Sequence, residues 1–160
     1  MPRYHMNKTE QEIADRDSLV DILKRGKYAI IAVCREGEPY IVTLNHGYDE
    51  RRNALYFHCA LKGLKIDFVR HNPDVCATVI EDGGYKMGRC EQAYRSVVFW
   101  GKMHVVEDLE EKKYGIDVLL NHLEDEPDEV RERSLKSEEA YEEVGILRLD
   151  ITEMTGKQGE

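Results

Sequence analysis

The chain has 160 residues, of which 41% are hydrophobic and 34% are charged, and this composition is typical of one globular domain with a core of its own. Its formal net charge of -9 disfavours a nucleic-acid-binding or membrane-surface protein, because both kinds of surface attract positive charge. The sequence has no uncharged span of about 18 residues, and it begins with no apolar signal segment. We therefore expect a cytoplasmic protein in which residues 1–160 form a single domain.

The first part of the chain predicts one helix followed by three strands. Thr9-Glu10-Gln11-Glu12 has the spacing of a capping box, and an apolar stripe at Leu19, Ile22 and Leu23 follows it. These signals predict a helix over residues 9–25. Apolar runs bounded by turn residues then predict strands over residues 28–33, 40–44 and 54–59.

The second part predicts two more helical regions and three more strands. After Lys62, an apolar pattern predicts a helix that ends at His71-Asn72-Pro73. A helix capped by Asp108 and a solvated acidic excursion form a helical acidic insertion at about 108–143. The interior Gly101 predicts a bulge. Residues 82–92 are expected to form a polar loop, and the strands to cover residues 75–80, 96–106 and 144–151.

Strands joined mostly by hairpins, with few helices, predict a mainly β (α+β) fold. Its antiparallel sheet would close into a small barrel, with the helices packed outside. A parallel nucleotide-binding sheet is disfavoured, because the chain has one clear strand–helix–strand unit. It also has neither G-x-G-x-x-G nor G-x-x-x-x-G-K-[ST].

The segment from Tyr56 to Lys65 predicts an anion site at the junction of a strand and a helix. Gly63 allows a tight backbone path, and the first turn of a helix offers unpaired N–H groups and a positive dipole end. Lys62 and Lys65 add positive charge there, which favours a phosphate. The alternative is a solvated helix start that carries two surface lysines.

The four cysteines predict no metal site. None of them forms a Cys-x-x-Cys pair, so a structural zinc site has little support. Cys34, Cys59 and Cys76 lie in apolar runs and are expected to be buried, whereas Cys90 lies in a polar stretch and is the more exposed candidate.

Four motifs in the same order resemble a known family. They are Pro39-Tyr40-Ile41-Val42-Thr43, the stretch from Tyr56 to Lys65, Asn72-Pro73-x-Val75-Cys76, and the stretch from Tyr94 to Lys102. Together they resemble the pyridoxamine 5'-phosphate oxidase-like superfamily of FMN-binding split-barrel proteins, and within it the nitroimidazole-resistance, nitroreductase-like branch. The resemblance covers about residues 3 to 106. It implies an antiparallel six-stranded split β-barrel that forms a homodimer with FMN at the subunit interface.

The resemblance also implies a set of cofactor-binding residues. Lys65 matches the family's phosphate-binding lysine, with Lys62 close enough to assist. Ser96 falls where oxidase members carry a glutamine near the flavin, and Arg95 keeps the adjacent arginine. Two strand segments would line the ring and the ribityl chain, namely Tyr40, Ile41, Val42, Thr43, Leu44 and Asn45 on one strand and His58, Cys59 and Ala60 on the next.

The resemblance favours an FMN-dependent oxidoreductase, flavin-reductase-like, that reduces a small organic substrate. His58 is the catalytic candidate, as a proton donor beside the cofactor, and the alternative is a histidine satisfied within the sheet. The oxidase's C-terminal arginine and histidine have no equivalent, which disfavours vitamin B6 oxidation. A haem or deazaflavin protein, with His46, His58 or Cys59 as an imagined haem ligand, and a non-catalytic flavin-binding protein remain as alternatives. The expected partners are a second copy of the chain and the substrate, with no nucleic acid and no membrane.

Overall fold

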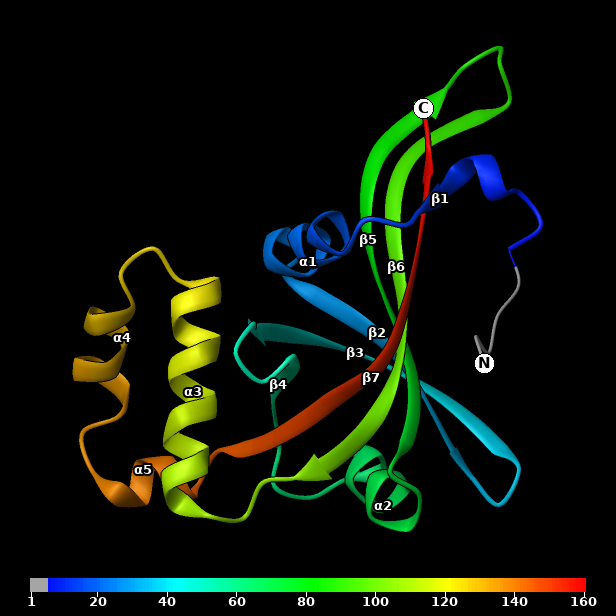
Figure 1. Ribbon diagram of the computed structural model, residues 1–160. Coiled ribbons are helices and arrows are strands. Elements are labelled where there is room, and N and C mark those ends of the chain that lie inside the picture. Colours follow the sequence, from blue (N-terminus) through cyan, green and yellow to red (C-terminus); the bar gives the residue numbers. More distant parts are fainter. Residues whose placement is uncertain (1–5) are drawn as a thin grey trace.

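The computed structural model describes residues 6–160, so the first five residues of the predicted domain lie outside the described residues. Seven strands form one antiparallel sheet in the order β1-β7-β4-β3-β2-β5-β6 (Figure 1). A further pairing of β6 with β7 closes the strands from β2 to β7 into a ring. This architecture confirms the mainly β (α+β) split-barrel prediction.

The described residues form seven strands and six helices, one of them a 3-10 helix. The strands are β1 (Glu12–Ile13), β2 (Tyr28–Arg35), β3 (Glu38–Asp49), β4 (Ala54–Cys59), β5 (Asp74–Lys86), β6 (Glu91–Val105) and β7 (Gly145–Gly159). The helices are the short 3-10 helix η1 (Thr9–Gln11), α1 (Arg16–Arg25), α2 (Leu64–His71), α3 (Leu109–Leu123), α4 (Pro127–Ser134) and α5 (Glu138–Glu142). In Figure 1, α3, α4 and α5 form a lobe at the left of the barrel. None of the helices in residues 6–160 combines the length and the apolar character needed to span a bilayer.

Two hydrophobic clusters hold the fold together. The larger one fills the barrel, where Leu55 and Phe57 of β4 meet the buried faces of α1 and α2. The smaller one lies between the outer face of the sheet and α3, where Tyr56 packs with residues such as Ile116. The alternation of side chains along a strand therefore divides β4 between the two clusters.

Glycine allows α3 to lie close to the sheet. A Cβ atom on Gly47 of β3 would lie 2.8 Å from the Cα atom of Leu119, and one on Gly115 of α3 would lie 2.6 Å from the Tyr56 ring. Both distances are too short for a side chain. The outer face of β3 and β4 is thus built to receive this helix.

The predicted helix over residues 9–25 is wrong in its first half. The helix begins at Arg16, because the Asp15 side chain accepts a hydrogen bond from the Ser18 backbone N–H at 3.0 Å and caps it. Ile13 instead pairs with Gly156 in β7 and is buried. A contact with a distant strand therefore overrides the local capping-box pattern.

The predicted polar loop over residues 82–92 is also wrong. β5 and β6 continue past Ile80 as a hairpin, with a register shift between Asp82 and Gly84, and pair as far as Lys86 and Glu91. The hairpin projects beyond the barrel at the top of Figure 1. Because the residues of this extension are mostly exposed, its sequence lacks the apolar alternation that would have marked a strand.

Other predictions hold. β4 covers residues 54–59 as predicted, and Asp108 caps α3 by accepting a hydrogen bond from the Glu111 N–H at 2.9 Å. The ladder between β6 and β7 shifts register between Trp100 and Gly101, which confirms the bulge. Of the cysteines, Cys59 is buried and Cys90 exposed as predicted, whereas Cys34 and Cys76 are half-buried. β7 runs beyond the predicted strand 144–151 because its second half pairs with β6 and β1.

Candidate functional site

The predicted flavin-facing segment of β3 presents alternate residues to opposite sides of the barrel wall. Ile41, Thr43 and Asn45 are exposed on the outer face. Val42 and Leu44 instead pack into the barrel cluster. A ligand on the outer surface would therefore meet the side chains of the first set and only the backbone of the second.

β4 continues this outer surface. The register pairs His46 with Phe57, so Asn45 of β3 lies beside His58 of β4. His58 is exposed, and both residues line one cavity. The Asn45 side chain donates a hydrogen bond from Nδ2 to the Lys27 carbonyl oxygen at 3.0 Å, which fixes its orientation. Two of the predicted site residues are thus brought together from different strands.

Cys59 points the other way. It belongs to the barrel cluster, and burial raises the pKa of its thiol. The positive charge of the nearby Lys65 lowers the pKa of the same thiol, so this charge lies close to the end of β4. Ala60, the next residue, is exposed at the point where the strand ends.

The start of α2 is open and lacks a side-chain cap. Gly63 occupies the N-cap position with φ of 146°, and no atom lies within 4 Å of the place where its Cβ would stand. The first backbone bond of the helix runs from the Asp67 N–H to the Gly63 carbonyl oxygen at 3.2 Å, so the N–H groups before it have no helical acceptor. Lys62 is exposed there and Lys65 is half-buried.

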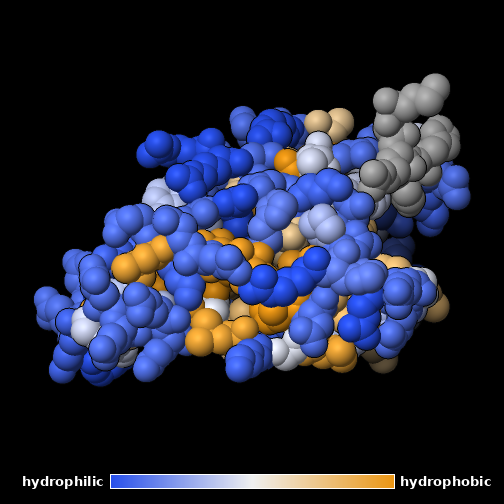
Figure 2. All heavy atoms as spheres, turned by 90° about the horizontal axis from the view of Figure 1, so that it is seen from below, coloured by the Kyte–Doolittle hydropathy of each residue, from blue (hydrophilic) through white to orange (hydrophobic). Residues whose placement is uncertain are grey.

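Aromatic contacts fix this helix against β3. The Tyr40 ring lies 5.5 Å from the Phe68 ring of α2, and the Arg35 guanidinium lies over the same Phe68 ring at 4.4 Å. Tyr40 therefore joins the predicted ring-binding strand to the predicted phosphate site. Seen from below, the molecule carries apolar surface near its centre, beside the largely hydrophilic helical lobe at the left (Figure 2).

Arg95 and Ser96 lie apart from these residues. Both are on β6, which β2 and β5 separate from β3 in the sheet. The Arg95 guanidinium forms ion pairs with Glu81 at 2.8 Å and with Asp21 of α1 at 2.7 Å, and these carboxylates raise its pKa. Arg95 thus connects α1 to the sheet, and within one chain it does not join the group around β3 and β4.

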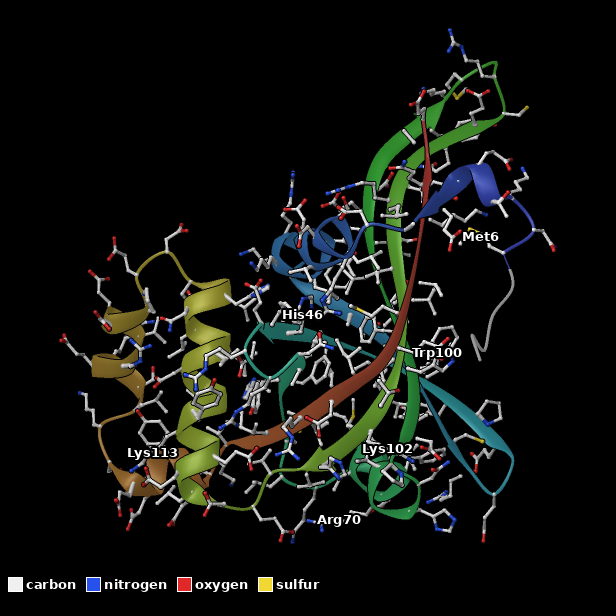
Figure 3. The ribbon with its side chains drawn as sticks, in the orientation of Figure 1. Met6, His46, Arg70, Trp100, Lys102 and Lys113 are labelled. Atoms are coloured by element: carbon white, nitrogen blue, oxygen red, sulfur yellow. The ribbon has the colours of Figure 1, made fainter. Side chains whose placement is uncertain are left out.

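Ser96 lies on a surface that is separate from the helical lobe. It lines a cavity of about 180 Å³ together with Met6 and Trp100. Figure 3 shows Met6 and Trp100 on the side of β6 away from α3. Trp100 is only partly buried and lies on the outer face of the sheet.

His46 is a core residue. Its Nε2 lies 2.9 Å from the Leu23 carbonyl oxygen and donates to it, while its Nδ1 is buried with no hydrogen-bond partner in the described structure. The ring of His122 lies 4.9 Å away, and its Nε2 donates to the Gly26 carbonyl oxygen. Burial lowers the pKa of His46 to about 4 and also lowers that of His122. Burial therefore favours the neutral form of both rings, and their hydrogen bonds give them a structural role; Figure 3 labels His46.

The outer face of the sheet is unusually apolar for an exposed surface. Ile41, Tyr28 and Ile80 expose 64%, 55% and 51% of their surface. The strand registers bring them to the same face as partly exposed apolar residues of β2 and β6, namely Ile30, Val98 and Trp100. We call these six residues the outer apolar face. The sequence signal for this face was that β2 and β5 carry apolar residues at successive positions, so that both faces of each strand are apolar.

No group of three or more histidine, cysteine, aspartate or glutamate side chains in residues 6–160 is arranged to hold a metal ion. The chemistry that the site offers is therefore that of exposed polar side chains on β3 and β4, an imidazole at His58, and the cationic start of α2.

Solved structures share this fold. A candidate 5-nitroimidazole antibiotic resistance protein from Bacteroides thetaiotaomicron VPI-5482 is 26% identical, with a TM-score of 0.77 over 91% of this chain and 85% of that one. The flavocytochrome Anf3 from Azotobacter vinelandii is 19% identical, with a TM-score of 0.83 over 100% of this chain and 75% of that one. An FAD and heme binding protein from Mycobacterium smegmatis is 20% identical, with a TM-score of 0.77 over 94% of this chain and 74% of that one. The last two likenesses concern the fold alone.

Sequence comparisons point to the same family. An uncharacterized protein of Rhizobium meliloti (strain 1021) is 29% identical over 90 residues, which are 56% of this chain and 54% of that protein. The chain thus matches about half the length of this curated relative. The family model described as pyridoxamine 5'-phosphate oxidase matches residues 15–158, nearly all of the barrel and the helical lobe. The chain therefore belongs to the pyridoxamine 5'-phosphate oxidase-like family and has the split-barrel fold that includes the nitroimidazole resistance protein.

Proposed function

We propose that this chain is an FMN-dependent oxidoreductase that acts as a homodimer and reduces a small organic substrate. The observations that carry the proposal are the outward-facing residues of β3, the neighbouring His58 of β4 and the uncapped start of α2. Proteins of the same fold are named for flavin chemistry, as in a flavocytochrome and an FAD and heme binding protein, which supports a flavin here.

The start of α2 suits the FMN phosphate. The free N–H groups of the first turn donate hydrogen bonds to anions, and the helix dipole favours negative charge at this end. Lys62 and Lys65 add the charge that a phosphate dianion requires on a chain with a net charge of -9. The open space at Gly63 lets the phosphate approach the backbone.

The outer surface of β3 suits the rest of the cofactor. Ile41 offers an apolar contact for the flavin ring, and the hydroxyl of Thr43 and the amide of Asn45 offer hydrogen bonds to its polar edge. Bound FMN would supply the electron transfer, while the protein binds and orients it. His58 would hold a proton on a ring nitrogen for donation to the substrate.

The outer apolar face supports a homodimer. A patch with several half-exposed isoleucine, valine and aromatic side chains is characteristic of a surface that another molecule covers. Covering it with a second copy would also enclose the open surface of β3, and cofactor sites are normally enclosed.

Haem is the second candidate, because two proteins of this fold are named for haem. A haem iron needs an axial ligand such as histidine or cysteine. His46 has its Nε2 engaged with Leu23 and is fully buried, and Cys59 lies in the barrel cluster. Of the three residues considered, His58 alone is exposed, so the haem alternative depends on this one side chain.

The absorption spectrum of the purified protein tests the proposal. We expect flavin bands, and mass spectrometry of the cofactor released by denaturation should identify FMN rather than FAD or a deazaflavin. Protein purified without cofactor should take up added FMN and reduce a small organic acceptor when a reduced nicotinamide is supplied. A Soret band, or no chromophore and no FMN binding, would contradict the proposal.

A further inference from the structure

A cavity lies between the helical lobe and the barrel. Its volume is about 330 Å³, roughly twice that of a cavity of about 150 Å³ that holds benzene. Residues of α3, such as Leu120 and Leu123, form one wall, and Val130 of α4 and Leu135 form another. Asn45 and His58 of the barrel lie on its remaining side.

Side-chain bonds fix the walls of this cavity. Arg131 of α4 binds Asp117 of α3 at 2.8 Å and the Asn121 side chain at 3.2 Å. Lys113 of α3, labelled in Figure 3, lies 3.5 Å from Glu138 of α5. The lobe is therefore held as a unit, and the cavity is preformed, as ligand pockets usually are.

The lining selects for one chemical class. It is mostly aliphatic, and its polar side chains are few: Asn45, His58, Glu124 and Ser134. Among the lining residues of the described chain there is a carboxylate but no lysine or arginine, so an anion entering the cavity would lose its hydration without gaining a charge partner. A neutral, largely apolar molecule fits this surface.

We propose that this cavity is the substrate pocket of the flavin site, and that it takes a neutral, largely apolar molecule whose polar group is hydrogen-bonded by His58. The inference rests on the proposed function, because His58 belongs both to the cavity and to the surface assigned to the cofactor. The acidic helical excursion thus supplies the substrate-binding wall.

A matched pair of probes tests the inference. 2-Naphthol is neutral and 2-naphthoate is an anion with the same ring system, and both would be titrated by calorimetry into the FMN-loaded protein. We expect one 2-naphthol site per chain and binding of 2-naphthoate at least tenfold weaker. His58→Phe should weaken 2-naphthol about two- to tenfold, as the loss of one hydrogen bond does.

Three tryptophan variants locate the binding site. Leu120→Trp and Ser134→Trp would fill the cavity and should weaken 2-naphthol at least tenfold, while FMN affinity measured by fluorescence stays within twofold. Ser134 is exposed, so its variant keeps the test valid if Leu120→Trp fails to fold. Leu109→Trp, on α3 but outside the cavity, should leave both affinities unchanged.

Two results would overturn the inference while leaving the proposed function intact. They are FMN binding without saturable 2-naphthol binding, and 2-naphthol binding that neither cavity-filling variant weakens. A protein that binds 2-naphthol in the expected pattern but binds no FMN would overturn the proposed function, and with it the substrate role of the cavity.

Discussion

The buried His46, which lies beside the half-buried His122, predicts a loss of stability in mildly acidic solution. Burial holds the pKa of His46 at about 4 in the folded protein, against 6.5 when the side chain is free in water. Between these values the unfolded chain binds the proton and the folded chain does not, so the free energy of unfolding decreases as the pH falls. The positive charge of Lys27, and that of His122 once the falling pH protonates it, also lower the pKa of His46.

The size of the effect follows from the two pKa values. Each pH unit between them contributes about 1.4 kcal/mol, so His46 alone should remove about 3 kcal/mol between pH 7 and pH 4. The loss should level off below about pH 4, where the folded protein also binds the proton. Such a loss is a large part of the stability of a typical domain.

Urea unfolding at several pH values between 7 and 4 would measure the loss. His46→Gln keeps an amide that can donate to the Leu23 carbonyl oxygen and has no titrating group, so its stability should fall less steeply than that of the wild type over this range. His71→Gln, at an exposed histidine of α2, is the matched control and should keep the wild-type slope. Parallel curves for the wild type and His46→Gln would refute the reasoning.

The remaining predictions concern the cofactor, the partner and catalysis. Lys65→Ala should weaken FMN binding about ten- to hundredfold in a fluorescence titration, because a charge-assisted contact is lost. Lys62→Ala should weaken FMN binding less. Lys136→Ala, an exposed lysine in the lobe, should change nothing, and an unchanged Lys65→Ala would remove the phosphate assignment. Light scattering should give about twice the chain mass of 18.6 kDa, and Ile41→Asp should shift the protein toward the monomer and reduce flavin content. A wild-type monomer that still binds flavin tightly would contradict the shared site. His58→Asn should keep the fold and most of the FMN affinity but lower turnover about 10²–10⁴-fold, whereas normal turnover in the flavin-loaded variant would end its catalytic role.

The sequence predicts those parts of the fold that local signals determine. An apolar run between turn residues predicts β4, and the capping residue Asp108 predicts the start of α3. The pairing of Ile13 with β7 depends on a strand that comes more than a hundred residues later, so the local pattern at residues 9–12 was misleading. The outer half of the β5–β6 hairpin was missed because neither of its faces is buried.

In the candidate site too, the features set by neighbouring residues could be predicted, and those that depend on contacts between distant segments could not. The open start of α2 could be predicted, because a glycine and two lysines at the end of a strand are neighbours in the sequence. The cavity could not, because it forms only when the acidic excursion folds back over β3 and β4. Leu120, Leu123, Val130 and Leu135 were the available signal, as apolar residues within or next to a highly charged stretch.

The position of β7 in the chain affects how the protein must fold. This strand pairs with β1, β4 and β6, and all three precede it in the sequence. During synthesis, the ring therefore stays open until the ribosome has released residues 145–159, and until then β4 and β6 each present an unpaired edge. Such edges bind other strands readily, and pairings between distant segments form slowly. A nascent chain of this protein should therefore depend on chaperones more than a helical domain of equal length, and shortening it before Gly145 should lead to aggregation rather than to a smaller barrel.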